Sequence, residues 1–153
     1  MLKTKDVPNY LREFNSLFST IGRGQSPALI FDDFLTIVIC VLARQTQENL
    51  YLDTVRKNSK DELNKYAEVL GTLFIIYDKE ITSGDWVDPL GDYYEALASN
   101  HKKSGLGQFF TPKTLCDLMA DFTIKPKDYG NKINDPTAGS GRNLLAANRV
   151  CKG

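Results

Sequence analysis

The feature that most constrains the fold is a strand–turn–helix pattern that comes only at the end of the chain. Residues 133–149 read INDPTAGSGRNLLAANR: a short apolar entry, an acid and a proline, small residues, and then a helical run. The INDP segment is predicted to be a short strand, and residues 142–151 a helix. One strand cannot form a parallel sheet. The 153-residue chain is therefore predicted to be mainly α-helical with one terminal strand–loop–helix.

Apolar residues recur at helical spacing through most of the remaining chain. Helices are predicted at residues 9–20, 28–44, 61–77, 89–99 and 111–123. The run TIVICV within 28–44 is also compatible with a strand, but the length of the apolar segment and the lack of hairpin residues in the polar segment 45–59 favour a helix. Residues 78–90 are predicted to be a connection that overlaps the start of the next helix, and residues 100–107 and 125–132 loops.

The helix predicted at 111–123 has a recognisable start. Thr111 is expected at the N-cap and Pro112 at the first helical position. One face of this helix is then apolar, and it consists of Leu115, Leu118, Met119 and Phe122. Trp86, between two aspartates, is expected to pack in the core.

Charge and cysteine content restrict the function classes. The formal net charge is zero and the isoelectric point is near 6.6, whereas a strongly basic DNA-binding domain has a value above about 9. The three cysteines lack a CxxC pair, so neither a disulfide framework nor a zinc site is predicted. The N-terminus has no signal-peptide pattern, and the apolar run 34–43 is too short to span a membrane. We expect a cytoplasmic protein with no metal site and no membrane association.

Residues 135–141, DPTAGSG, have the composition of a ligand-binding loop. Glycines let the backbone approach a ligand closely, and the following helix offers free N–H groups. The loop is not a P-loop, because no Lys-Ser/Thr pair follows it. It is not a complete dinucleotide fingerprint, because the third glycine is missing. It is not a nucleophile elbow, because Ala138 occupies the position where that motif needs glycine. Taken alone, it is also compatible with an ordinary glycine turn or a nucleotide-phosphate site.

A second motif, GQFFTP, occupies residues 107–112. Taken alone, it is compatible with a capped helix whose preceding aromatic side chains lie in the core.

The two motifs in this order resemble the gamma-class adenine-specific DNA methyltransferases. The similarity is greatest to the modification subunits of type I restriction systems and their phage-borne or mobile-element relatives. The family pattern is Gly-Gln-Phe/Tyr-Phe-Thr-Pro, a helix, and then Asp-Pro-Ala/Cys-x-Gly-Ser/Thr-Gly. GQFFTP matches throughout, whereas DPTAGSG departs at Thr137, and Arg142 follows where the family more often has a small or apolar residue. The match covers about residues 89–150.

The resemblance implies an α/β Rossmann-like methyltransferase as the parent enzyme and S-adenosylmethionine as its cofactor. It implies a helical N-terminal region at 1–100 and the start of the methyltransferase domain at 101–153. The implied cofactor-binding residues are Gln108, Phe109, Phe110, Thr111, Pro112, Asp135, Thr137, Gly139, Ser140 and Gly141.

The chemistry of the cofactor agrees with these residue types. Asp135 is expected to accept hydrogen bonds from the cofactor's ammonium, and backbone N–H groups near Thr111 or in the glycine loop to bind its carboxylate. Phe109 or Phe110 is expected to lie against the sulfonium or the adenine ring.

The catalytic motif of the family, Asn/Asp-Pro-Pro-Tyr/Phe, is absent from the 153 residues. In these enzymes it holds the target amino group and stacks on a flipped-out adenine. The acid that usually binds the cofactor ribose is also absent. Three explanations are open: a fragment of a longer methyltransferase, a short protein that lost catalysis, or a core completed by another chain.

Under each explanation the chain alone is predicted not to methylate DNA. The implied partners of the parent enzyme are double-stranded DNA, contacted through parts outside this chain, and either a specificity subunit or a second copy of the chain. The alternative is a non-catalytic helical interaction or DNA-binding module derived from such a methylase.

Overall fold

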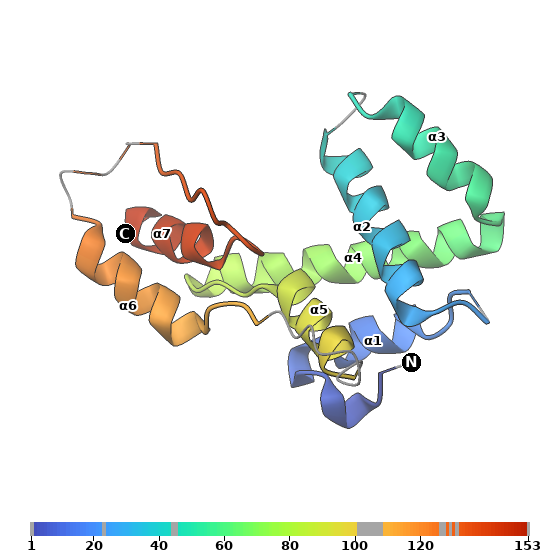
Figure 1. Ribbon diagram of the computed structural model, residues 1–153, viewed down its shortest axis with the longest axis horizontal. Helices are drawn as coiled ribbons and strands as arrows, with labels where there is room; N and C mark the ends of the chain where they lie inside the picture. Colours follow the sequence, from blue (N-terminus) through green and yellow to red (C-terminus); the bar gives the residue numbers. More distant parts are fainter. Residues whose placement is uncertain are drawn as a thin grey trace. The chain divides into compact units, whose positions relative to one another are not determined.

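A computed structural model describes residues 2–22, 24–43, 46–100, 109–125, 128, 130 and 132–152. The described residues form helices joined by loops, and none of them lies in a β-strand (Figure 1). The chain divides into two compact units, Met1–Ile75 and Ile76–Gly153. The mainly helical character predicted from the sequence is therefore confirmed.

The helices of the first unit are η1 (Thr4–Asp6), η2 (Asn9–Leu11), α1 (Arg12–Phe18), α2 (Pro27–Ala43), α3 (Glu48–Lys57) and most of α4 (Lys60–Ser83). The second unit contains the end of α4, α5 (Pro89–Asn100), α6 (Lys113–Thr123) and α7 (Arg142–Lys152). Every helix predicted from apolar spacing is present, with boundaries that differ by a few residues.

Side-chain caps fix the starts of two helices in the first unit. The Ser26 hydroxyl accepts a hydrogen bond from the Leu29 N–H at 3.3 Å, next to the proline that begins α2. At the start of α4, Ser59 and Glu62 form a reciprocal capping box, in which the Glu62 carboxylate accepts the Ser59 N–H at 2.9 Å and the Ser59 hydroxyl accepts the Glu62 N–H at 3.3 Å. The hydrogen bond from the Ser59 N–H lowers the pKa of Glu62.

The core of the first unit is built from aromatic side chains. The ring of Phe34 is centred 5.6 Å from that of Phe14, 5.2 Å from that of Phe18 and 6.4 Å from that of Tyr66. The Tyr66 hydroxyl donates to the Ile30 carbonyl at 3.3 Å, so this buried polar group is satisfied. These contacts join α1, α2 and α4 around one apolar centre.

The core of the second unit is built around small side chains. Cys116 and Ala120 of α6 face Ala146 of α7, and Trp86 completes the cluster. Small residues let two helices approach closely, and α6 and α7 are indeed the most extensively packed pair of helices. The expectation that Trp86 lies in the core is confirmed.

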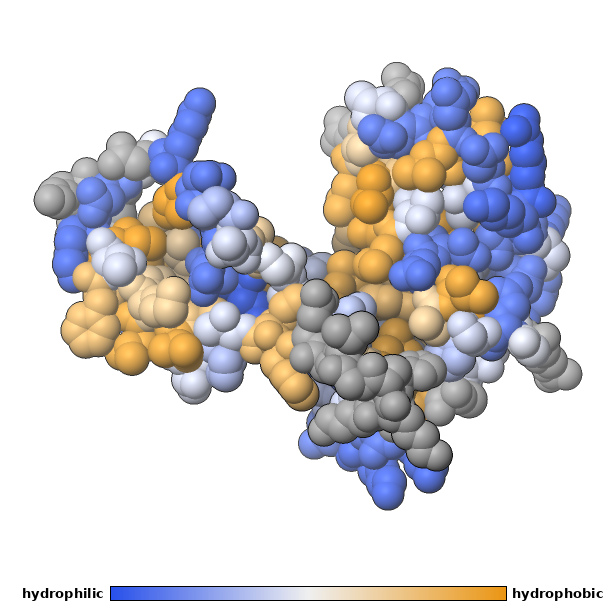
Figure 2. All heavy atoms as spheres, in the orientation of Figure 1, coloured by the Kyte–Doolittle hydropathy of each residue, from blue (hydrophilic) through white to orange (hydrophobic). Residues whose placement is uncertain are grey.

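The apolar face predicted on α6 is not the face that packs in this unit. Leu115, Leu118, Met119 and Phe122 are exposed, Phe122 by 70%. Figure 2 shows apolar side chains at the surface over α6. The small residues on the opposite side of the helix fit against α7, which leaves the larger side chains outside.

One helix was not predicted, and two predictions about local structure were wrong. The segment 45–59 contains α3, whose Glu48 in the first turn and Arg56 and Lys57 in the last turn suit the helix dipole. Helix α4 extends through Ser83 and ends in a Schellman motif at Gly84, whose φ is +78°. There the Gly84 N–H donates to the Ile81 carbonyl and the Asp85 N–H to the Glu80 carbonyl, both at 3.2 Å.

The second wrong prediction concerns the INDP segment, which is not a strand. A strand is defined by the ladder of hydrogen bonds to a neighbour, and the described residues supply no neighbouring strand. The start of α6 also differs by one residue, because Pro112, not Thr111, is the N-cap and no side chain caps the helix. The predicted loop at 100–107 lies outside the described residues except for Asn100, the last residue of α5.

Candidate functional site

The glycine loop begins with an aspartate held by its own neighbours. One oxygen of Asp135 accepts the Thr137 N–H at 2.9 Å and the Thr137 hydroxyl at 3.2 Å, and the other accepts the Asn143 amide at 3.2 Å. The hydrogen bond from the Thr137 N–H, followed by that from Asn143, lowers the pKa of Asp135. Its carboxylate is therefore ionised at neutral pH and fixed in direction.

Two glycines then reverse the chain into α7. Gly139 and Gly141 have φ values of +56° and +86°, which residues other than glycine rarely adopt. The Gly141 N–H closes a turn on the Ala138 carbonyl at 2.7 Å, and α7 begins at the next residue. The first N–H groups of α7 have no partner within the helix, so this end suits an anionic group.

The structure brings the described parts of the two motifs together. A Cβ atom placed on Gly139 would lie 3.4 Å from Cδ1 of Phe110, so the Phe110 ring covers the glycine loop. The neighbouring Phe109 has 73% of its surface exposed. Gln108 lies outside the described residues. Phe110 of the GQFFTP motif thus forms one side of the glycine loop.

The connection between the motifs is made by Arg142, which sequence reasoning treated only as a departure from the family pattern. Its side chain is buried, with 7% of its surface exposed. Nε donates to Asp88 at 2.9 Å, Nη1 to the Thr111 carbonyl at 3.3 Å, and Nη2 to Asp92 at 2.7 Å and Glu95 at 3.1 Å. Burial alone would lower the pKa of Arg142, but the hydrogen bond and charge of Asp88 and the charge of Glu95 outweigh burial and raise it.

Asp88 is the buried acid on which this arrangement depends. One of its oxygens accepts hydrogen bonds from Ser140 of the glycine loop and from Arg142. The other accepts the Gly91 N–H at 2.9 Å, which caps the start of α5. A Cβ atom on Gly91 would lie 2.0 Å from the first oxygen, so glycine is needed at this position.

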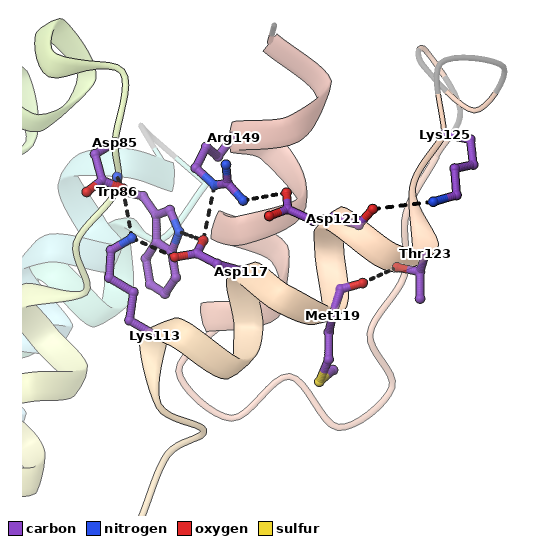
Figure 3. Close-up of polar contacts among 9 residues, drawn as sticks. All are labelled: Asp85, Trp86, Lys113, Asp117, Met119, Asp121, Thr123, Lys125 and Arg149. Carbon is purple, nitrogen blue, oxygen red and sulfur yellow. Dashed lines mark hydrogen bonds and ion pairs between the residues drawn. The ribbon is translucent and has the colours of Figure 1, made fainter.

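A second polar cluster fastens α6 to α7 on the side of Trp86 (Figure 3). The Asp117 carboxylate accepts the Trp86 indole N–H at 2.7 Å, Lys113 at 2.9 Å and Arg149 at 3.1 Å. Burial raises the pKa of Asp117, but hydrogen bonds from Trp86 and Lys113 outweigh it and give a net lowering. Lys113 also lies 4.5 Å from the centroid of the Trp86 ring.

A cavity of about 420 Å³ adjoins this cluster and is lined by Tyr77, Ile81, Trp86, Leu145 and Arg149 among others. None of the described residues of the two motifs lines it. Burial, and to a lesser degree Asp88, raises the pKa of Tyr77 to about 12. The cavity is therefore separate from the glycine loop.

Nowhere among the described residues do three or more His, Cys, Asp or Glu side chains gather in a way that suits a metal ion. Within the same part of the chain, no helix combines the length and apolar character needed to cross a membrane.

Comparison with known proteins gives a match over part of the chain. Residues 86–153 match the model of the N-6 DNA methylase family. This part of the chain is therefore similar to N-6 DNA methylases. The match includes both described motif segments and begins at Trp86, a residue of the second unit's core.

Curated proteins similar to this segment include subunits of type I restriction enzymes. The methylase subunit of the MpnII enzyme from Mycoplasma pneumoniae is 41% identical over 68 residues, which is 42% of this chain and 12% of that protein. The methylase subunits of StySPI from Salmonella potsdam and EcoKI from Escherichia coli are each 38% identical over 68 residues, with the same coverage. No solved structure matches the chain.

These comparisons confirm the resemblance to restriction–modification methylases that the two motifs predicted. The chain spans about an eighth of the length of the curated relatives it matches, that is 12%.

Proposed function

We propose that this chain carries part of an S-adenosylmethionine site and that the complete enzyme methylates adenine in DNA. The observation that supports this most directly is the contact of Phe110 with Gly139, which joins the FFTP and DPTAGSG segments into one cradle. In the complete enzyme the bound cofactor would supply the methyl group to the exocyclic amino nitrogen of adenine, with release of S-adenosylhomocysteine and of one amino proton.

The donor and acceptor groups of the cradle fit the methionine end of this cofactor. Asp135 presents an ionised carboxylate for the ammonium group. Asn143, which bonds Asp135, also has a buried Oδ1 that lacks a hydrogen-bond partner. Two acceptors at one place suit a ligand that brings several N–H or O–H donors. The N–H groups at the start of α7 suit the cofactor's carboxylate.

The two phenylalanines take different roles in this proposal. Phe110 supports the glycine loop, and Phe109, whose ring is mostly exposed, is the one that a ligand reaches without displacing the loop. Its π face would then lie against the sulfonium or the adenine ring. Gln108, Thr111, Pro112, Thr137, Ser140 and Gly141 complete the proposed cofactor-binding set.

Calorimetry with S-adenosylmethionine tests the site. We expect the full chain to bind the cofactor and Asp135→Ala to abolish the heat of binding. The matched control is Asp53→Ala, which removes an exposed carboxylate from α3 and is expected to bind as the unmodified chain does. Equal binding by both variants would contradict the proposed role of Asp135.

Catalysis by the 153 residues alone is not expected, because the Asn/Asp-Pro-Pro-aromatic motif is absent from the sequence. Incubation with labelled S-adenosylmethionine and an adenine-containing duplex should leave the DNA unlabelled. Transfer of label by the purified chain would refute this expectation. Double-stranded DNA and a specificity subunit are proposed as partners of the complete enzyme.

One observation favours a second candidate, a helical interaction module without catalysis. Several large apolar side chains are exposed together on one face of α6, among them Leu118 by 52% and Phe122 by 70%. Such a group differs from the single exposed apolar residues that are normal on a protein surface. The same calorimetry separates the candidates, because an interaction module has no reason to bind S-adenosylmethionine through Asp135.

A further inference from the structure

Arg142 touches both motifs of the proposed cradle and the helix that supports them. It belongs to the first turn of α7, directly after the glycine loop, and its guanidinium reaches the Thr111 carbonyl and three acids of α5 and its cap. Four hydrogen bonds from one side chain use the planar fork of arginine in a way that the single ammonium of lysine cannot reproduce.

The acids that bind Arg142 also hold the backbone and side chains of the motifs. Glu95 accepts the Phe110 N–H at 2.6 Å with one oxygen and Arg142 with the other. Asp88 accepts the Ser140 hydroxyl with the same oxygen that binds Arg142. Arg142 is therefore linked to Phe110 of one motif through Glu95, and to Ser140 of the other motif through Asp88.

The aromatic contact completes this arrangement. The guanidinium carbon of Arg142 lies 5.2 Å from the centroid of the Phe110 ring, whose edge lies against Gly139. Tyr94 packs beside the same ring, with centroids 5.7 Å apart. A buried cation over an aromatic face favours one ring position over others.

Arg149, about two helix turns further along α7, shows what an ordinary structural arginine does in this unit. It pairs with Asp117 at 3.1 Å and with Asp121 at 2.7 Å, both on α6. Neither partner belongs to a motif. It provides a matched control for Arg142.

We propose that Arg142 is a positioning residue, which holds Phe110 and Thr111 against the glycine loop and thereby sets the width of the cradle. The effect on cofactor affinity rests on the proposed function; the effect on the ring of Phe110 does not. Preorganisation of this kind improves binding by removing the cost of ordering the loop and Phe110.

The test uses the full chain with 4-fluorophenylalanine at position 110, in the background of Arg142→Lys and, as control, Arg149→Lys. Lysine keeps a positive charge among the three carboxylates but loses the fork. We expect Arg142→Lys to move the fluorine resonance toward its position in the denatured chain, while the fluorescence of Trp86 stays native. Arg149→Lys should leave the resonance where it is. An unchanged resonance in Arg142→Lys overturns the proposal.

Calorimetry on the same variants, without the fluorine label, tests the consequence for the ligand. Arg142→Lys should bind S-adenosylmethionine about tenfold more weakly than the unmodified chain, and Arg149→Lys equally well. If the unmodified chain gives no heat but the fluorine resonance responds, the proposed function fails and the positioning role stands. Binding that Arg142→Lys leaves intact contradicts the link between ring position and affinity.

A second variant keeps the test decisive if Arg142→Lys loses the native fluorescence of Trp86. Glu95→Gln retains an oxygen for the Phe110 N–H but removes one charge that faces Arg142. The same fluorine measurement then applies: a shifted resonance supports the network and an unchanged one overturns it.

Discussion

Replacement of Gly91 by alanine should reverse the usual sign of a glycine-to-alanine change in a helix. In an open helical position alanine is favoured by up to about 1 kcal/mol. At Gly91 the added Cβ would lie 2.0 Å from one Asp88 oxygen and 2.6 Å from its Cγ, so the carboxylate must move. Asp88 is buried and bonded to Ser140, Arg142 and the Gly91 N–H, and therefore cannot move without breaking those bonds.

The minimum size of the effect follows from two of these bonds, the α5 cap and the bond to Arg142. Loss of the α5 cap costs about 1 kcal/mol, and loss of a hydrogen bond between charged groups costs about 1.5–3 kcal/mol. Arg142 keeps Asp92 and Glu95, so the full penalty for breaking a buried pair does not apply. Subtracting the helix gain of about 1 kcal/mol leaves a net destabilisation of about 1.5–3 kcal/mol.

Gly71 supplies the matched control. It lies in the exposed part of α4, its φ is not positive, and a Cβ there would meet no atom within 4 Å. Gly71→Ala should therefore raise the free energy of unfolding by about 0.5–1 kcal/mol. Denaturation in urea, followed by far-ultraviolet circular dichroism and by the fluorescence of the single tryptophan, measures both variants. A Gly91→Ala chain as stable as Gly71→Ala would refute the steric argument.

Three further outcomes are expected. Ser59→Ala removes the hydroxyl of the capping box and should lower the free energy of unfolding by about 1 kcal/mol, as measured by circular dichroism. Because the pKa of Asp117 is lowered in the folded chain, its contribution to the free energy of unfolding is present above its ordinary pKa near 3.8 and is lost as the pH falls below that value. Asp117→Asn removes this titrating group. The acid unfolding transition, followed by the fluorescence of Trp86, should therefore become less steep. Phe122→Ser should leave unfolding within about 0.5 kcal/mol of the unmodified chain, because that ring is exposed; a larger loss would show that the α6 face is buried in the isolated chain.

The helices could be predicted from the sequence because their signals are local. Spacing of apolar residues located α2 and most of α4, and Pro89 marked the start of α5. Helix α3 was missed because its apolar spacing is weak, although Glu48 at its start and Lys57 at its end carried a charge signal. The end of α4 was also readable, since the Ser83–Gly84 pair fits a helix C-terminus.

The strand prediction failed for a different reason. The sequence of 133–136 is compatible with a strand, but a strand exists only through its neighbours, and local sequence does not say whether they are present. The face of α6 illustrates the same limit. Its large apolar residues were correctly grouped, whereas the choice of which face packs on α7 depends on the close fit of Cys116, Ala120 and Ala146.

The two motifs were identified from sequence because their residue types and order are specific, but the side chain that joins them was not. Arg142 was noted only as an exception to the family pattern. Its partners Asp88 and Glu95 lie 54 and 47 residues earlier, beyond any periodic pattern. A local reading therefore had no reason to connect them.

A signal for this connection was nevertheless present on α5. Asp88, Asp92 and Glu95 are spaced four and three residues apart, which places three carboxylates on one side of the start of a helix. Such a row is unfavourable when it is buried without a cation. Arg142 therefore supplies the cation that these three acids require, and the acids account for an arginine where the family pattern has a small or apolar residue. An unusual residue beside a ligand motif is thus best interpreted together with oppositely charged residues elsewhere in the chain.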